Sequence, residues 1–265
     1  MKIGVVGCAG RMGQMLVREI AATPGCTVAG GTERVGGPAV GKDIGLVAGI
    51  EALGVAVVDD PAVLFAEADA VIDFTSPEAT ERHAALAAQS ETALIIGTTG
   101  IGPAQQASIA AAATHTPIIQ APNMSVGVNL LLALVEKVAG TLGEDYDIEI
   151  VEMHHRHKVD APSGTALGLG RAAAAGRGVA LDDVKQAVRD GHTGPRPRGE
   201  IGFATLRGGD VVGDHTVVFA TDGERIELTH KASSRQVFAK GAVRAALWAA
   251  DKQPGLYSMR DVLGL

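Results

Sequence analysis

The stretch Lys2-Ile3-Gly4-Val5-Val6-Gly7-Cys8-Ala9-Gly10-Arg11-Met12-Gly13 decides the fold of this chain. It begins as an apolar run typical of a buried strand, and it ends in glycines at every third position. Residues 14–22 then carry apolar side chains at helical spacing. Glycines between a strand and a helix let the backbone approach a pyrophosphate, whose charge the helix N-terminus holds. In a chain with 35 glycines the spacing alone means little, so its position between strand and helix carries the prediction of a dinucleotide-binding turn.

The first half of the chain continues as short apolar runs separated by segments of helical spacing. The expected strands are 26–30, 55–58, 70–74, 93–97 and 117–120, and the expected helices include 77–89 and 103–113. Strands that alternate with helices in this way predict an α/β fold with a parallel sheet.

The loops after these strands are candidates to line a ligand crevice, because ligands bind at the carboxyl ends of parallel strands. Three of them are small and polar, namely Phe74-Thr75-Ser76-Pro77, Gly97-Thr98-Thr99-Gly100 and Ala121-Pro122-Asn123-Met124-Ser125. Their backbone and hydroxyl groups can reach a cofactor, although ordinary turn chemistry explains each of them equally well.

Glu33 and Arg34 follow the second expected strand. An acid at this place can bind the ribose hydroxyls of the adenosine half, whereas an arginine suits a 2′-phosphate. The two together suggest tolerance of both NADH and NADPH. An ordinary exposed charge pair is the alternative interpretation.

The composition restricts the class of protein. A length of 265 residues predicts one large or two smaller domains. The net charge of -7 argues against a nucleic-acid partner, which would favour a basic chain. Two cysteines are too few for a disulfide framework and fit a reducing compartment. Neither a secretion signal nor an apolar run of about 18 residues is visible, so a cytoplasmic protein without a membrane partner is expected.

The segment Glu152-Met153-His154-His155-Arg156-His157-Lys158-Val159-Asp160-Ala161-Pro162-Ser163-Gly164-Thr165 concentrates ionisable side chains. Histidines beside cations donate protons readily near neutral pH. Residues 163–165 open an expected helix, whose free N–H groups can bind an anion. The segment therefore predicts an active site for a small anionic substrate. A solvated basic loop is one alternative, and a zinc site is another, disfavoured because the histidines lack the i, i+4 spacing of helical ligands.

The second half also predicts a second domain. The expected helices are 126–142, 163–175 and 235–250, and the expected strands are 146–153, 201–206, 211–220 and 225–230. Asp222-Gly223 is a strong hairpin signal, which favours an open, mostly antiparallel sheet. Such a sheet can pack against copies of itself, so a homo-oligomer is expected. The Pro- and Gly-rich residues 191–199 are either a mobile lid or a plain connector. The last helix is expected to return to the first domain.

Motifs along the whole chain resemble those of the dihydrodipicolinate reductases, also called 4-hydroxy-tetrahydrodipicolinate reductases. They are Gly7-x-x-Gly10-Arg11-Met12-Gly13, Asp73-Phe74-Thr75, Gly97-Thr98-Thr99-Gly100, Asn123-x-Ser125-x-Gly127-x-Asn129, the segment 152–165, Gly191-His192-Thr193-Gly194 and Lys231-Ala232-Ser233-Ser234-Arg235. The segment 152–165 is the most specific of them.

This resemblance implies a fold and a reaction. The implied fold is a Rossmann dinucleotide-binding domain, residues 1–125 with 235–265, and an α+β substrate-binding and tetramerisation domain on an open mixed sheet, residues 126–234. The implied reaction is hydride transfer from NADH or NADPH to the ring carbon of a small dicarboxylate that loses its hydroxyl. The pathway implied is lysine and diaminopimelate biosynthesis, and the implied assembly is a homotetramer.

The resemblance also implies roles for single residues, and no metal. His154 and Lys158 match the proton-donor positions, and His155, Gly164 and Thr165 match the substrate contacts. The expected cofactor contacts are Gly7, Cys8, Ala9, Gly10, Arg11, Met12, Glu33, Arg34, Gly97, Thr98, Thr99, Ala121, Pro122, Asn123 and Met124.

Two other classes of protein compete with this interpretation. A semialdehyde dehydrogenase needs a thiol nucleophile in its second domain, but Cys8 and Cys26 both lie in the first thirty residues. A redox-sensing regulator without catalysis would have no use for the proton donors of 154–158, and a DNA partner fits a net charge of -7 poorly. The sequence alone does not choose between NADH and NADPH, nor does it say whether the enzyme itself removes the hydroxyl.

Overall fold

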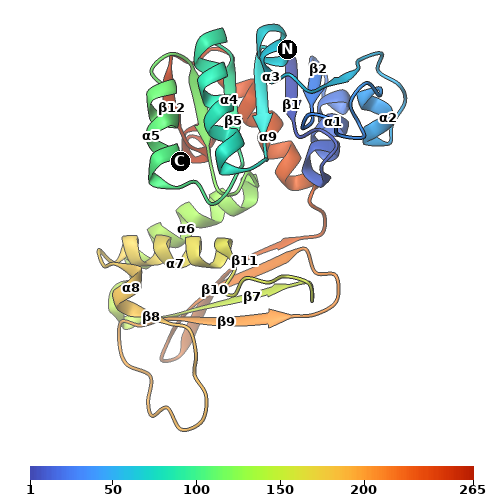
Figure 1. Ribbon diagram of the computed structural model, residues 1–265. Helices are drawn as coiled ribbons and strands as arrows, with labels where there is room; N and C mark the ends of the chain where they lie inside the picture. Colours follow the sequence, from blue (N-terminus) through green and yellow to red (C-terminus); the bar gives the residue numbers. More distant parts are fainter. The chain divides into compact units, whose positions relative to one another are not determined.

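The computed structural model describes residues 1–265, which form two compact units. The first unit consists of residues 1–126 with 236–264, and the second consists of residues 127–235 with Leu265. Each unit is built on a sheet of its own (Figure 1).

The first unit contains a seven-stranded sheet in which every pair of neighbouring strands is parallel. Its strands are β1 (Lys2–Val6), β2 (Thr27–Thr32), β3 (Val57–Val58), β4 (Ala70–Asp73), β5 (Ala93–Ile96), β6 (Pro117–Gln120) and β12 (Gly255–Tyr257). Their spatial order is β12-β6-β5-β4-β1-β2-β3. The predicted parallel α/β sheet is confirmed. The order reverses at β1, and this is the point where a doubly wound sheet opens a crevice beyond its carboxyl ends.

Helices cover both faces of this sheet (Figure 1). They are α1 (Arg11–Ala22), α2 (Ile44–Ala48), α3 (Pro61–Glu67), α4 (Pro77–Ser90), α5 (Pro103–Ala112), α9 (Gln236–Ala249) and α10 (Met259–Leu263). Alternate side chains of β1 enter different cores: Ile3 and Val5 pack with α1 and α9, whereas Val6 packs with α3, α4 and α5. Burial on both faces explains why these strands are continuous apolar runs.

The second unit contains a five-stranded sheet in the order β11-β10-β7-β9-β8. Its strands are β7 (Asp147–His154), β8 (Lys185–Gln186), β9 (Ile201–Arg207), β10 (Gly213–Thr221) and β11 (Glu224–Ala232). β10 is antiparallel to both β11 and β7, and Gly223 has φ 89° in the predicted hairpin turn. The sheet is mixed, as the resemblance implies, because β7 and β8 each pair parallel with β9. A long crossover that carries a helix separates β7 from β9, and such a crossover permits parallel pairing.

Two helices cover one face of this second sheet. α6 (Val126–Leu142) and α7 (Gly164–Gly176) supply Leu131, Val135 and Leu169 to a core with Ile148, Ile150 and Phe219 of the strands. A short 3₁₀ turn, η1 (Gly143–Asp145), follows α6, and α8 (Leu181–Val184) follows α7. By length and composition alone, the span Val126–Asp145 could cross a membrane, but a single such helix is weak evidence, since core helices pass the same test.

The segment 191–199 joins β8 to β9 without regular secondary structure. Arg196 ties this segment to β7, because its guanidinium donates to Glu149 Oε1 at 2.9 Å and to Asp147 Oδ1 at 2.7 Å. Arg189 adds a further bond of 2.8 Å to Glu149 Oε2. Arg196 within the segment and Arg189 just before it therefore anchor this connection to the strand that precedes the histidine cluster.

Candidate active site

The glycine turn after β1 has the geometry that a dinucleotide-binding loop requires. Gly7 has φ +68°, and the Gly10 N–H donates to the Gly7 carbonyl at 3.0 Å. A Cβ at position 13 would lie 2.2 Å from the Gly7 carbonyl oxygen, so only glycine fits there. α1 begins at Arg11 without a side-chain cap, which leaves the N–H groups of its first turn available to an anion.

A cavity of about 1010 Å³ opens beside this turn. Five of the predicted cofactor residues line it: Gly7, Ala9, Gly10, Glu33 and Arg34. Thr75, from one of the three candidate loops, also lines it. The rest of the lining was not assigned to the cofactor from the sequence and consists of Thr32, Val35, Pro38, Ala39, Asp59, Pro61, Ala79, Arg82, His83, Ala85 and Leu86. Asp59 follows a strand, so the rule that ligands bind beyond carboxyl ends could have found it. No sequence signal marks the face of α4 that turns to the cavity.

The cavity carries charges of both signs. Glu33 Oε1 accepts the backbone N–H of Ala9 at 2.9 Å, which ties the acid to the glycine turn. Arg34 and Arg82 are both exposed and line the same cavity. The site can therefore offer an acceptor to ribose hydroxyls and guanidinium groups to a phosphate.

Cys8 lies in the turn but contributes no reactive thiol. Its side chain is fully buried, and its N–H donates to the Thr32 carbonyl at 3.1 Å. Burial, together with the charge of Glu33, raises the pKa of the Cys8 thiol to about 12. The thiolate needed by a nucleophilic mechanism is therefore strongly disfavoured. Arg11 and Met12, the next two predicted cofactor residues, do not line the cavity.

A buried carboxylate joins two of the predicted cofactor loops. Asp73 is fully buried at the end of β4, and its Oδ1 accepts the Thr75 hydroxyl at 2.6 Å and the Thr98 hydroxyl at 3.3 Å. Its Oδ2 lies 2.8 Å from Nδ1 of His83, which lines the cavity. The Thr98 hydroxyl also accepts from Thr80 at 2.9 Å. This network fixes the loops after β4 and β5 to each other.

The other predicted nicotinamide contacts do not line the cavity. Gly97 packs under the Phe74 ring, since a Cβ there would lie 2.3 Å from ring carbons, and Thr99 is exposed. Ala121 and Met124 are buried, whereas Pro122 is exposed and Asn123 is half-buried. Roles for these residues toward a cofactor remain predictions.

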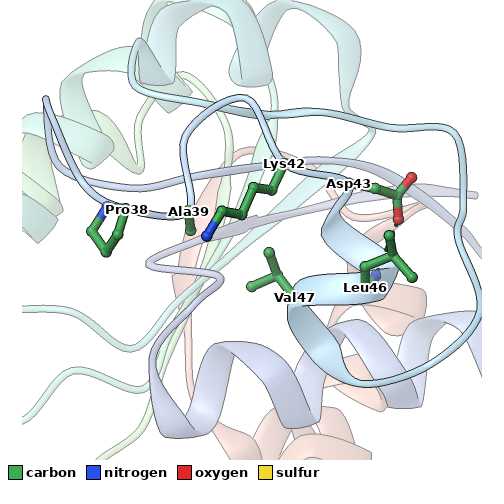
Figure 2. A pocket seen from close by; sticks show the side chains of 6 residues that line it. All are labelled: Pro38, Ala39, Lys42, Asp43, Leu46 and Val47. Atoms are coloured by element: carbon green, nitrogen blue, oxygen red, sulfur yellow. Dashed lines mark hydrogen bonds between the residues drawn. The ribbon is translucent and has the colours of Figure 1, made fainter.

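A smaller hollow of about 500 Å³ lies over α2 (Figure 2). Its acid, Asp43, caps α2 and accepts backbone N–H groups from Gly45 and Leu46, and from Gly54 at 2.7 Å. These hydrogen bonds lower the pKa of Asp43. The charge thus holds a loop in place, and the lining is otherwise mainly apolar apart from Lys42 (Figure 2).

In the second unit, the histidine segment follows the end of β7 directly. The His155 N–H donates to the Val211 carbonyl at 2.7 Å, and the Gly208 N–H donates to the His154 carbonyl at 3.0 Å. The Lys158 N–H closes the turn on the His155 carbonyl at 3.1 Å. The sheet therefore sets the position of the proton-donor candidates, which is the opposite of a freely solvated basic loop.

His154 is buried and held by an acid. Its Nδ1 lies 2.5 Å from Oε2 of Glu152, which is 1 % exposed. Arg207 donates to both oxygens of the same carboxylate, at 2.8 and 2.9 Å. The His154 and His215 rings meet edge to face, with centroids 5.1 Å apart.

Helix α7 presents its N-terminus at the same place. Ser163 caps it, because its hydroxyl accepts the Ala166 N–H at 3.1 Å. Gly164 is exposed and Thr165 half-buried at the start of the helix, and their roles as substrate contacts stay predictions. Lys158 Nζ lies 2.7 Å from Asp160 Oδ1, and this pairing lowers the pKa of Asp160.

His155 is held as a neutral ring, although its basic neighbours in the sequence suggest a cation. Its Nε2 lies 3.4 Å from a guanidinium nitrogen of Arg235, so this ring nitrogen must accept. Desolvation, followed by the charges of Arg235 and of the neighbouring histidines and Lys158, lowers the pKa of His155. Its Nδ1 is buried without a partner. A neutral His155 therefore carries its hydrogen on Nδ1 and accepts at Nε2.

Sequence profiles of one family cover both units. The profile described as "Dihydrodipicolinate reductase, N-terminus" matches residues 1–124, and the one described as "Dihydrodipicolinate reductase, C-terminus" matches residues 127–263. The chain belongs to the dihydrodipicolinate reductase family.

Relatives in this family match along their whole length. The 4-hydroxy-tetrahydrodipicolinate reductase of Dinoroseobacter shibae is 59% identical over 263 residues, which are 99% of this chain and 98% of the relative. The enzyme of the same name from Brucella melitensis is 59% identical over 266 residues, which are 100% of this chain and 99% of the relative.

Solved structures agree with the dihydrodipicolinate reductase fold. The dipicolinate-bound dihydrodipicolinate reductase of Paenisporosarcina sp. TG-14 has a TM-score of 0.77 at 22% identity, and the match covers 97% of each chain. An amine dehydrogenase from Mycobacterium smegmatis has a TM-score of 0.62 at 12% identity, and the match covers 97% of this chain and 95% of that one. At these identities the likeness concerns the fold alone.

In this member of the dihydrodipicolinate reductase family, no group of three or more His, Cys, Asp or Glu side chains is arranged to hold a metal ion. The three histidines at 154, 155 and 157 instead serve different neighbours. His154 meets Glu152, His155 meets Arg235, and the His155 and His157 ring centroids lie 6.2 Å apart.

A buried histidine in this dihydrodipicolinate reductase gives a prediction about acid stability. Burial lowers the pKa of His215 to about 4, below the value of 6.5 of a free histidine. Between these two values the unfolded chain binds the extra proton, so His215 destabilises the fold as the pH falls through this window. The Nε2 of His215 lies 3.0 Å from the Ser163 hydroxyl, a partner that a glutamine amide can keep. We expect the stability of His215→Gln to fall by roughly 1–3 kcal/mol less than that of the wild type between pH 7 and pH 4.5. Urea unfolding at several pH values measures this difference.

The exposed His115 supplies the control for that experiment. His115→Gln should follow the wild-type dependence of stability on pH. Parallel curves for His215→Gln and the wild type would show that His215 is not the group that titrates.

Proposed function

We propose that this chain catalyses the NADH- or NADPH-dependent reduction of 4-hydroxy-tetrahydrodipicolinate (dihydrodipicolinate) to tetrahydrodipicolinate in lysine and diaminopimelate biosynthesis. The segment from Glu152 to Thr165 carries this proposal, because it combines proton-donor candidates held by hydrogen bonds with a helix N-terminus. The substrate is suggested by the name of the full-length relatives at 59% identity.

The first unit fits a dinucleotide. The glycines of its turn carry no Cβ at the place where a pyrophosphate would approach, and the cavity beside the turn has a volume of about 1010 Å³. Gly7, Ala9 and Gly10 would hold the pyrophosphate, and Glu33 and Arg34 would meet the adenosine ribose. The reduced nicotinamide supplies a hydride to the ring carbon of the substrate that loses its hydroxyl.

The residues of the second unit handle protons and carboxylates. The reaction consumes one hydride and one proton and releases water, so a proton donor must stand near the substrate ring. His154 and Lys158 are the donors that we propose. We propose that His155, Gly164 and Thr165 bind the substrate carboxylates at the start of α7.

We further propose that both NADH and NADPH serve as reductant. Glu33 on the glycine turn suits the free ribose hydroxyls of NADH, and Arg34 with Arg82 suits the 2′-phosphate of NADPH. All three side chains line one cavity. The arginines can therefore offset the repulsion between Glu33 and a 2′-phosphate, and Glu33 still leaves an acceptor for a free ribose hydroxyl.

A homotetramer is the assembly that we propose, with neither nucleic acid nor membrane as a partner. The sheet face opposite α6 and α7 presents Leu206, which is 49% exposed, and the half-buried Val151, Met153 and Val218. Copies of this face could cover one another. Light scattering after size exclusion should give about four times the chain mass of 27.0 kDa. A monomer mass would contradict the proposal.

The two free cysteines fit the cytoplasm that we propose as its location.

The deciding experiment follows NADH and NADPH oxidation at constant enzyme. The substrate is generated freshly by aldol condensation of pyruvate with aspartate semialdehyde. Oxidation that depends on this substrate supports the proposed reaction, and the two rates rank the cofactors. Folded protein that binds nucleotide but oxidises neither cofactor would contradict it.

A further inference from the structure

One buried carboxylate, that of Glu152, joins three parts of the candidate site. Glu152 is 1 % exposed on β7, and its two oxygens accept four hydrogen bonds. Oε1 accepts the Ser163 N–H at 3.0 Å and Arg207 Nη2 at 2.9 Å. Oε2 accepts Arg207 Nη1 at 2.8 Å and meets His154 Nδ1 at 2.5 Å. Each oxygen thus has two donors, which is about the full capacity of an ionised carboxylate.

We propose that Glu152, clamped by Arg207, is a positioning residue that holds the Nδ1–H of His154, so that the charged ring donates its second proton from Nε2 and is left neutral with its hydrogen on Nδ1. The inference rests on the proposed function, in which His154 donates a proton to the substrate. Neither Glu152 nor Arg207 touches the substrate in this scheme, and both act through His154.

The ionised state of Glu152 supports this assignment. Burial acts to raise the pKa of Glu152, but hydrogen bonds from Arg207, His154 and the Ser163 backbone more than offset it and hold the pKa below its usual range. An ionised carboxylate can only accept, so the His154 nitrogen that faces it must carry a hydrogen. This is the arrangement by which a buried acid orients a catalytic imidazole and stabilises its charged form.

The surroundings of His154 leave room at the other ring nitrogen. A Cβ at position 213 would lie 3.0 Å from His154 Nε2, so glycine at the start of β10 keeps that side of the ring open. His215 borders the ring on one edge, and burial lowers its pKa to about 4. A neutral neighbour of this kind does not oppose a positive charge on His154 near pH 7.

The same carboxylate also fixes the anion site. Ser163 is the N-cap of α7, and its N–H binds Glu152 while its hydroxyl caps the helix. Arg207 in turn donates to the Asp160 carbonyl at 2.7 Å, in the turn before the helix. Glu152 and Arg207 therefore hold the proton donor and the helix end at a fixed separation, as a substrate bearing both a carboxylate and a reacting carbon requires.

The first test compares Glu152→Gln with Glu149→Gln. Glu149 lies on the same strand and also accepts from guanidinium groups, those of Arg189 and Arg196, but it contacts no histidine. We expect Glu152→Gln to lower kcat ten- to hundredfold and to change KM less than about threefold. Glu149→Gln should keep kcat within about twofold. A preserved kcat in folded Glu152→Gln overturns the inference, as does an equal loss in both variants.

The second test needs no variant, which matters if Glu152→Gln fails to fold. Nitrogen-15 NMR of the histidine rings reports which nitrogen carries the hydrogen in the neutral state. We expect Nδ1–H for His154 in the wild-type protein, and a neutral ring with its hydrogen on Nε2 overturns the inference. His154→Gln identifies the signals. This readout is separate from turnover, so wild-type protein that oxidises neither cofactor would contradict the proposed function and leave the ring measurement valid.

Discussion

Lys158→Ala should lower kcat by a factor of roughly 10² to 10⁴ if Lys158 acts as a general acid. The side chain is 20 % exposed and its Nζ lies 2.7 Å from Asp160 Oδ1, so a primary ammonium is held at the end of the histidine turn. Alanine removes both the proton and the positive charge. The Lys158 backbone N–H, which closes the turn on the His155 carbonyl, stays in place. The loss should therefore fall on turnover rather than on folding.

Initial rates with saturating cofactor, together with melting temperature, measure this effect. Lys137→Ala is the matched control, because Lys137 is an exposed lysine of α6 in the same unit. Asp160→Asn separates the role of the lysine from that of its ion pair, since it frees the ammonium without removing it. If Lys158→Ala turns over at the wild-type rate, Lys158 has no part in the mechanism.

The sequence predicted the first unit well because its signals are local. A strand that is buried on both faces is apolar throughout, which makes it visible in the sequence. The turn after it needs glycine wherever a Cβ would clash with the backbone, as at Gly13. The strand β12 was missed because it has three residues, Gly255–Tyr257, too few to show a period. Its pairing with β6 at the sheet edge depends on the tertiary fold that α9 completes.

The side-chain contacts of the candidate site that the sequence did not predict join distant segments. Glu152 and Arg207 are 55 residues apart, and the parallel register that pairs His154 with Arg207 brings them together. The sequence signalled only the hairpin of this sheet, because a hairpin signal is visible in four residues whereas a crossover is not. Periodicity likewise predicted α4 but could not say that Arg82 and His83 face a cavity.

The motif also assigned some residues to a ligand whose side chains serve the protein itself. Thr98 was predicted as a cofactor contact, yet its hydroxyl binds Asp73, Thr75 and Thr80. A small polar loop looks the same in sequence whether its hydroxyls face inward or outward. In this protein the hydroxyls face inward because the buried carboxylate of Asp73 needs nearby hydrogen-bond donors.

Gly13→Ala should abolish measurable NADH binding, with a rise in Kd of at least about a hundredfold, equivalent to about 2.7 kcal/mol. The new Cβ would lie 2.2 Å from the Gly7 carbonyl oxygen and 2.6 Å from the Cys8 Cα. Both atoms belong to backbone, so no side-chain rotation relieves the clash and the turn itself must move. A displaced turn loses the close approach to a pyrophosphate that its glycines provide.

Calorimetric titration with NADH and urea unfolding distinguish loss of binding from loss of the fold, since overpacking of this kind also costs about 1–3 kcal/mol of stability. Gly102→Ala is the control: it lies in the same unit with φ -87°, and its new Cβ would meet only the movable end of the Gln105 side chain, at 2.9 Å. That variant should bind NADH as the wild type does. Gly13→Ala protein with wild-type affinity would mean that the dinucleotide does not rest on this turn, because the clash is with the same carbonyl that receives the Gly10 N–H.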